Sequence, residues 1–202
     1  MDELERTRLS LHGVAESVIA GPQYRMHGTI RLAVTPGGFG GVKLPIRVEG
    51  TTLVWDGGRA PLTGTLGDLA KAAGVEPGLA GIYHDSSGIG VDHVLDVDPA
   101  AAALLAEAFA RGDAAMRLFA PDQTPVLWPE HFDLGISVDE VNYGISPGDA
   151  GHARPYAYVG PWRVPAQGGF WNAPFGALRP LDELPDAAAV AAFFAEGRGA
   201  AG

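Results

Sequence analysis

Apolar residues recur at helical spacing near the N-terminus, where the side chains that share one side are Leu4, Leu11, Val14, Ala15 and Val18. This spacing predicts an amphipathic helix over residues 3–20. The Gly21-Pro22 pair that follows predicts the end of that helix, because glycine and proline both interrupt a helical backbone.

Three further helices are predicted, and they span residues 66–73, 99–111 and 185–196. Thr65 and Asp68 have the spacing of a capping box for the first of them. Asp98-Pro99 supplies a side-chain cap and a first-turn proline for the second. The last helix places Phe193 and Phe194 toward the core, and the glycine-rich end of the chain is expected to fray.

Elsewhere apolar and polar residues alternate, as they do in strands with one buried face. The stretches read as strands or hairpins are 27–35, 42–49, 51–55, 81–97, 115–119, 131–138, 155–162 and 170–178. Pro45 cannot donate to a ladder, which predicts an edge strand or a bulge at that position. We expect 155–162 to pair with 131–138, and Pro147-Gly148 to form a type II turn between them. Together these patterns predict an α+β fold of mainly antiparallel sheets with four helices packed on them.

Two segments, one in each half of the chain, share the same residue spacing. Tyr24-x-x-His27 precedes one alternating stretch as Trp128-x-x-His131 precedes another, and each is followed by a strand bearing Trp and then a helix. We expect a single domain over residues 1–202. Within it, the shared spacing suggests two βββα copies, and these are 22–74 and 126–196, with 75–125 inserted.

Composition narrows the classes of partner. The formal charge is −10 and the chain has no cysteine. A negative surface repels phosphate backbones, so we expect no nucleic-acid partner, and no apolar run approaches the roughly 20 residues of a membrane span. The charged first residues carry no signal-peptide pattern, which predicts a cytoplasmic protein. We expect no cofactor, a small molecule as partner, and a monomer or a homodimer.

Three blocks of sequence resemble segments of an uncharacterised bacterial protein family, a domain of unknown function. They are LWPEHFDLGI, PYAYVGPW and FWNAPFGA, in that order along the chain, and GTIRLAVTP in the first half is similar to the matching segment of the same group. The resemblance implies a shared α+β fold with helices after the strands. It implies no activity and no catalytic residue.

The blocks fall in residues 127–177, and the stretch 128–176 holds nine of the chain's aromatic side chains. Large aromatics bury much area and often line pockets. We therefore expect a small-molecule-binding or interaction domain with an aromatic-lined concavity. Its candidate residues are Trp128, His131, Asp133, Tyr156, Tyr158, Trp162 and Trp171. A partner-binding surface of exposed Trp and Phe is another possibility.

The alternative is a metal-dependent or general acid–base hydrolase. His131 and Asp133 would share one face of a strand and serve as catalytic candidates. With two residues of the following loop they would give a nitrogen and oxygen donor set, and the metal candidates are therefore His131, Asp133, Asp149 and His152.

Two other motifs lack the context that their chemistry requires. The sequence from Gly144 to Gly148 matches G-x-S-x-G, but Pro147 follows the serine and has no N–H for an oxyanion hole. The glycine-rich stretch 37–41 lacks the spacing of a phosphate-binding loop, and we expect it to be a flexible hairpin connection.

Overall fold

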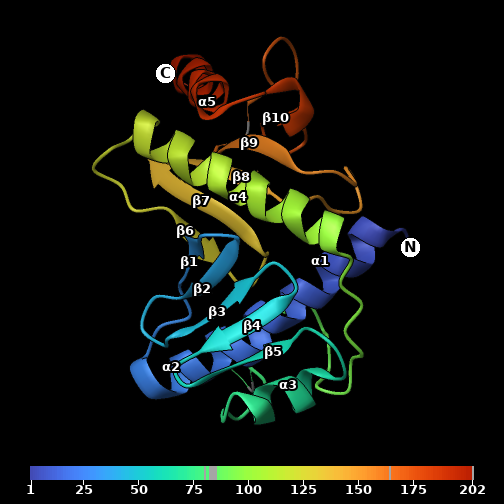
Figure 1. Ribbon diagram of the computed structural model, residues 1–202. Helices are drawn as coiled ribbons and strands as arrows, with labels where there is room; N and C mark the ends of the chain where they lie inside the picture. The colour runs from blue at the N-terminus through green and yellow to red at the C-terminus, as the bar shows by residue number, and fades with distance from the viewer. Residues whose placement is uncertain (80, 82–85, 164, 202) are drawn as a thin grey trace. The chain divides into compact units, whose positions relative to one another are not determined.

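The computed structural model describes residues 1–79, 81, 86–163 and 165–201 (Figure 1). The chain forms two compact units. Unit 1 comprises Met1–Glu107 and Leu127–Phe132, and unit 2 comprises Ala108–Val126 and Asp133–Gly202. Every strand pairing between described residues is antiparallel. Four α-helical segments and a short 3-10 helix, Leu181–Glu183, accompany the strands in the described residues, which confirms the α+β prediction.

The strands of unit 1 lie side by side in the order β6-β1-β2-β3-β4-β5. Their bounds are β1 Leu32–Thr35, β2 Gly38–Gly41, β3 Ile46–Glu49, β4 Thr52–Trp55, β5 Gly58–Pro61 and β6 Val126–Trp128. β3 lies between β2 and β4, so the prediction of an edge strand or bulge at Pro45 was wrong. Pro45 comes just before β3, where its missing N–H costs no ladder hydrogen bond.

The glycine-rich stretch forms strand β2, so the expectation of a flexible connection was wrong. β2 pairs with β1 on one side and β3 on the other, and Phe39 within it is buried. A Cβ built at Gly40 would lie 2.6 Å from Cβ of Arg47 on β3. These glycines therefore permit close contact between strands. From the sequence the stretch was expected only to be a loop, so this role was not predicted.

The N-terminal helical segment runs past the predicted stop. It consists of α1 Glu3–Gly13, the π-helical turn Val14–Ala20 and α2 Gly21–His27. The Gly21 N–H donates to Glu16 O, five residues back, which is the π-helical spacing. The wider turn accommodates Pro22 in the first turn of α2, a position where proline is tolerated. The segment ends at Gly28, whose φ of 70° is left-handed.

Gln23 is a fully buried polar side chain on α2. Its Nε2 donates to the carbonyls of Thr29 and Arg31, at 3.0 and 2.8 Å. Its Oε1 accepts from the N–H groups of Lys43 and Leu44, at 2.7 and 3.1 Å. One amide therefore satisfies four backbone groups that lie outside regular strands, and it ties two loops to the helix.

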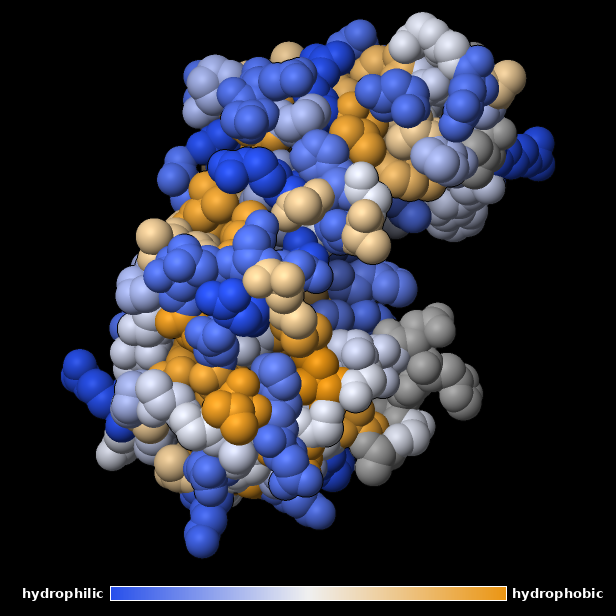
Figure 2. Space-filling view, turned by 90° about the vertical axis from the view of Figure 1, so that its right-hand side faces the viewer, coloured by the Kyte–Doolittle hydropathy of each residue, from blue (hydrophilic) through white to orange (hydrophobic). Residues whose placement is uncertain are grey.

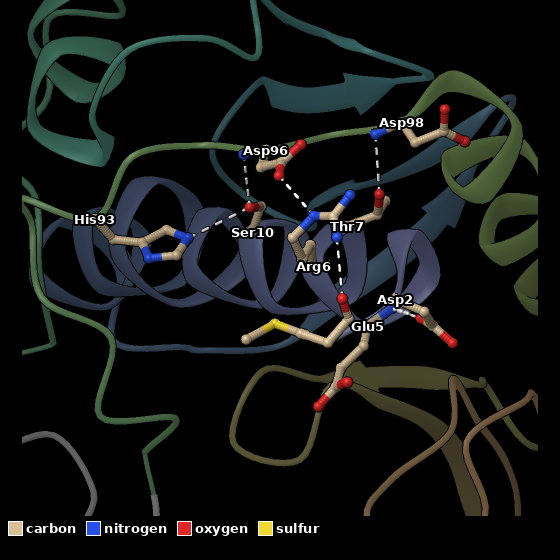
Figure 3. A network of polar contacts seen from close by, with 9 residues as sticks. Asp2, Glu5, Arg6, Thr7, Ser10, His93, Asp96 and Asp98 are labelled. Carbon is tan, nitrogen blue, oxygen red and sulfur yellow. Dashed lines mark hydrogen bonds and ion pairs between the residues drawn. The ribbon is translucent and has the colours of Figure 1, made fainter.

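Hydroxyl groups on α1 bind residues 96–98, the segment just before helix α4, Pro99–Phe119 (Figure 3). Thr7 Oγ1 accepts from the Asp98 N–H at 2.9 Å, and Ser10 Oγ accepts from the Asp96 N–H at 3.0 Å. Arg6 adds an ion pair of 2.7 Å to Asp96. Alternate N–H groups of an extended segment thus find acceptors on a helix instead of a neighbouring strand.

Helix α3, Leu66–Ala72, begins with the predicted capping box. Thr65 Oγ1 accepts from the Asp68 N–H, and the Asp68 carboxylate accepts from the Thr65 N–H. The predicted hairpin over 81–97 lies partly outside the described residues. Within 86–97 the structure has an isolated bridge of Val94 with Thr65 and no strand, because this segment bonds to α1 and α3 instead.

The strands of unit 2 follow the order β10-β9-β8-β7. Their bounds are β7 Asp133–Val138, β8 Val141–Ser146, β9 Tyr156–Pro161 and β10 Ala177–Pro180. β8 was not predicted, and it pairs with both β7 and β9, so the predicted direct pairing of 155–162 with 131–138 was wrong. Asp139 and Glu140 turn the chain between β7 and β8 with φ of 53° and 62°. Positive φ at both positions is the type I′ hairpin geometry, formed here without glycine.

Two helices pack on one face of the unit 2 strands. Helix α4, Pro99–Phe119, continues through Gly112, so the predicted strand over 115–119 was wrong. A Cβ at Gly112 would overlap the Ile145 side chain, and one at Gly197 in α5 would lie 2.7 Å from Val159. Helix α5, Ala187–Ala201, includes the residues expected to fray. Both glycines allow close helix–strand contact.

The predicted βββα copies stay a prediction. In each range neighbouring strands pair in chain order and a helix comes afterwards, α3 in the first and α5 in the second. Among the described residues, no helix has the length and apolar character needed to cross a membrane.

Candidate functional site

The strands of unit 2 present two chemically different faces. Tyr143, Ile145 and Val159 are fully buried on the face that receives α4 and α5. Because successive side chains alternate across a strand, the opposite face carries Gly144 and Ser146 of β8 with Tyr156 and Tyr158 of β9. The register places Gly144 opposite Tyr158, and Ser146 opposite Tyr156.

Tyr158 reaches across β8 to a carboxylate on β7. Its hydroxyl donates a hydrogen bond to Asp133 Oδ2. The ring lies over Gly144, where a Cβ would overlap it, and a Cβ at Gly135 would lie 3.3 Å from the hydroxyl oxygen. Glycines in β7 and β8 therefore form the track along which the phenol extends.

Tyr156 makes a second pair of the same kind. Its hydroxyl donates to Asp149 Oδ2 at 2.5 Å. The other oxygen, Asp149 Oδ1, accepts from the N–H groups of Gly151 and His152 at 2.7 and 2.9 Å, and these bonds order the loop after β8. In that loop Gly148 has a positive φ of 101°, but no hydrogen-bonded turn is assigned at Pro147 and Gly148, so the type II turn stays a prediction.

The aromatic rings on this face touch one another. Tyr156 contacts His152, Tyr158 and Phe175, with centroid distances of 5.3, 6.5 and 6.5 Å, and Tyr158 lies 6.3 Å from Phe175. Phe175 is 38% exposed. We name these side chains with their two carboxylates the tyrosine cluster, and its members are Asp133, Asp149, His152, Tyr156, Tyr158 and Phe175.

Both phenols of the tyrosine cluster resist ionisation. Burial, followed by the hydrogen bond to Asp149, raises the pKa of Tyr156 to about 12. Burial, followed by the charge of Asp133, raises the pKa of Tyr158 well above its usual value. At neutral pH both hydroxyls are therefore neutral donors, and the negative charge of each pair resides on its carboxylate.

The structure gathers part of the predicted site. Asp133, Tyr156 and Tyr158 lie in the tyrosine cluster, as do Asp149 and His152, which were predicted only as metal ligands. Phe175 was not predicted.

The other predicted residues are not members of this cluster. Trp128 belongs to unit 1, where the Arg31 guanidinium lies 5.7 Å from its ring. Trp162 is 63% exposed, and Trp171 is buried beside Phe170, with ring centroids 5.0 Å apart.

His131 also differs from its predicted setting. It is exposed in the turn before β7, and Phe132 beside it has a φ of 51°. β7 begins at Asp133, so His131 and Asp133 do not form the predicted pair on one strand face. The positive φ of Phe132 breaks the alternation on which that prediction depended.

The predicted metal ligands form no donor set in the described residues, and the general acid–base hydrolase stays a prediction. Over 1–79, 81, 86–163 and 165–201, no three His, Asp or Glu side chains are gathered as metal ligands. The serine of G-x-S-x-G ends β8 and is followed by an irregular loop, whereas a nucleophile elbow leads into a helix. Ser146 Oγ instead accepts from the Gly148 N–H at 3.2 Å.

Comparisons with models of protein families, with curated proteins and with solved structures found no match. No activity, substrate or partner is therefore carried to this chain from a relative. The resemblance of the three sequence blocks to a bacterial family stays a prediction.

Proposed function

We propose that this protein binds a small organic cation at the tyrosine cluster of unit 2. One observation carries the proposal: two carboxylates, Asp133 and Asp149, each accept a hydrogen bond from a neutral phenol within one group of touching rings. Ring faces and carboxylates are the two kinds of group that attract an ammonium ion.

The hydroxyls, carboxylates and rings of the tyrosine cluster would have different roles in binding. The phenol hydroxyls orient the carboxylates and do not cancel their charge, because their raised pKa keeps them neutral. Phe175 and Tyr158 retain exposure and supply apolar ring surface. A ligand with a positive amine and an aromatic or aliphatic body would satisfy both features at once.

The net negative charge of the whole chain also favours the binding of cations. A formal charge of −10 raises the local concentration of cations. On the face shown in Figure 2, hydrophilic residues are spread among smaller groups of apolar ones. The long-range field therefore attracts cations generally, and the tyrosine cluster would supply the selectivity.

Binding of phenethylamine and of its uncharged analogue 2-phenylethanol, measured by calorimetry and by NMR shifts, tests the proposal. We expect the amine to bind at least about tenfold more tightly than the alcohol, which corresponds to roughly 1.4 kcal/mol. Asp133→Asn should weaken amine binding by a similar factor. Asp182→Asn removes the same charge from an exposed residue outside the cluster and should leave binding unchanged.

Equal binding of amine and alcohol would contradict the proposed ligand class. Amine binding that both aspartate variants reduce equally would show only nonspecific attraction to a negative protein. Thermal unfolding of the variants separates lost binding from a lost fold.

A further inference from the structure

Strand β10 is the last strand of the unit 2 sheet on its side. It pairs with β9 through a register that sets Ala177 against Val159 and Arg179 against Ala157. The N–H and C=O groups of a strand alternate sides from one residue to the next. Both backbone groups of Leu178 bond the side chain of Asn172 and not β9, so the backbone groups of Leu178, and of Gly176 and Pro180 two residues away on either side, point away from β9, toward the free edge.

The side-chain amide of Asn172 occupies the centre of this edge. Its Oδ1 accepts from the Leu178 N–H at 2.9 Å, and its Nδ2 donates to the Leu178 carbonyl at 3.0 Å. An amide side chain has the same donor and acceptor as a peptide group. Asn172 thus makes with Leu178 the two hydrogen bonds that a residue of a neighbouring strand would make.

The positions on either side of Leu178 are closed as well. The Gly176 N–H donates to Ala173 O at 3.0 Å, and the Ala173 N–H donates to Gly176 O at 3.0 Å. Pro180 has no N–H to offer. Every outward N–H of β10 is therefore used within the chain or missing, and the segment around Asn172 supplies the partners.

Open sheet edges pair readily with another chain, and proteins block them with prolines, bulges and covering loops. We propose that Asn172 is an edge plug that keeps β10 from pairing with β10 of a second copy of this chain. The two edges would be self-complementary, because each would offer the Leu178 N–H and carbonyl in an antiparallel pair. Removal of the Asn172 amide would leave the N–H and the carbonyl of Leu178 without their side-chain partner and open to a second strand.

Self-association of the full chain tests the proposal, measured by sedimentation over a range of protein concentrations. Asn172→Ala should lower the dissociation constant for self-association by roughly tenfold or more relative to the unaltered protein. Asn142→Ala is the matched control, because Asn142 is an exposed asparagine of the same sheet whose side chain, within the described part of the chain, bonds the side chains of Ser137 and Trp162 and no backbone group. It should leave association unchanged.

A second substitution identifies the surface. Leu178→Pro, added to Asn172→Ala, removes the outward N–H without touching a ladder bond to β9 and should abolish the added association. Unchanged association of Asn172→Ala would overturn the proposal, and so would association that persists after Leu178→Pro. If the alanine variant does not fold, Asn172→Ser provides the same test, since serine is too short to bond both groups of Leu178.

Discussion

The hydroxyl of Tyr158 on β9 bonds the carboxylate of Asp133 on β7, with a whole strand between them. The intervening residue of β8 is Gly144, which pairs directly with Tyr158. Contact between side chains two strands apart requires a long side chain and an empty place in the strand between. A glycine in the interior of a strand is otherwise unfavourable, so its presence here is explained by the phenol that lies over it.

Gly144→Ala should destabilise the protein by about 1–3 kcal/mol, because the added methyl overlaps the Tyr158 ring and forces it from its place. Urea unfolding measures the loss. The matched control is Gly160→Ala on β9, where the nearest atom to an added Cβ is 3.7 Å away. If both variants were equally stable, Tyr158 would not depend on the glycine.

Gln23→Ala should cost at least about 2 kcal/mol of unfolding free energy, because it leaves four backbone groups near Thr29, Arg31, Lys43 and Leu44 without their partner. Gln123→Ala is the control, since that side chain is exposed. Chemical denaturation of the two variants measures the difference. A loss no larger than that of the control would show that water replaces the amide.

Acid should weaken unit 1 through His12. Burial, opposed by the charge of Glu16, lowers the pKa of His12 below 6.5. Its Nε2 donates to Pro129 O at 2.7 Å, and its ring stacks on Phe132 with centroids 5.4 Å apart. The unfolded chain then binds the proton more strongly than the folded one, so stability is lost as the pH falls below 6.5, by at most about 1.4 kcal/mol per pH unit.

His12→Gln should remove this contribution to the pH dependence. Unfolding free energies measured between pH 7 and pH 5, roughly the window around the ordinary histidine pKa, should fall less steeply than in the unaltered protein. His27→Gln, which replaces an exposed histidine, is the control and should keep the original slope. Equal slopes for all three proteins would contradict the assignment.

Sequence alone determined the features that depend on near neighbours in the chain. The capping box of Thr65 and Asp68 was predicted with its residues, because both partners lie within one turn of helix. The α+β class followed from the two spacings of apolar residues, the helical one and the alternating one. Each spacing places the apolar side chains on one face of its element, and that face is buried. Tyr156 and Tyr158 were predicted as site residues from the density of aromatic side chains, and Asp133 from its spacing to His131, and a site formed by them stays a prediction.

Only the tertiary structure decided what the glycines do. The helix predicted over 99–111 ended just before Gly112, and the Gly37–Gly41 stretch was predicted to be a flexible connection, but the structure shows that these glycines pack closely against Ile145 and β3. At Gly21, with Pro22 beside it, the helical segment continues through a π-helical turn. Glycine is written the same way in the sequence whether it makes the backbone flexible or makes room for a neighbouring side chain. The neighbour lies far away along the chain, so the sequence near the glycine does not reveal it.

The site itself depended on one turn that contains no glycine. Asp139 and Glu140 adopt positive φ without glycine, and the strand they create, β8, separates Asp133 from Tyr158. Strand pairing brings together residues distant in sequence, so the register that joins these two side chains is fixed by the packing of the sheet and not by the residues near either of them.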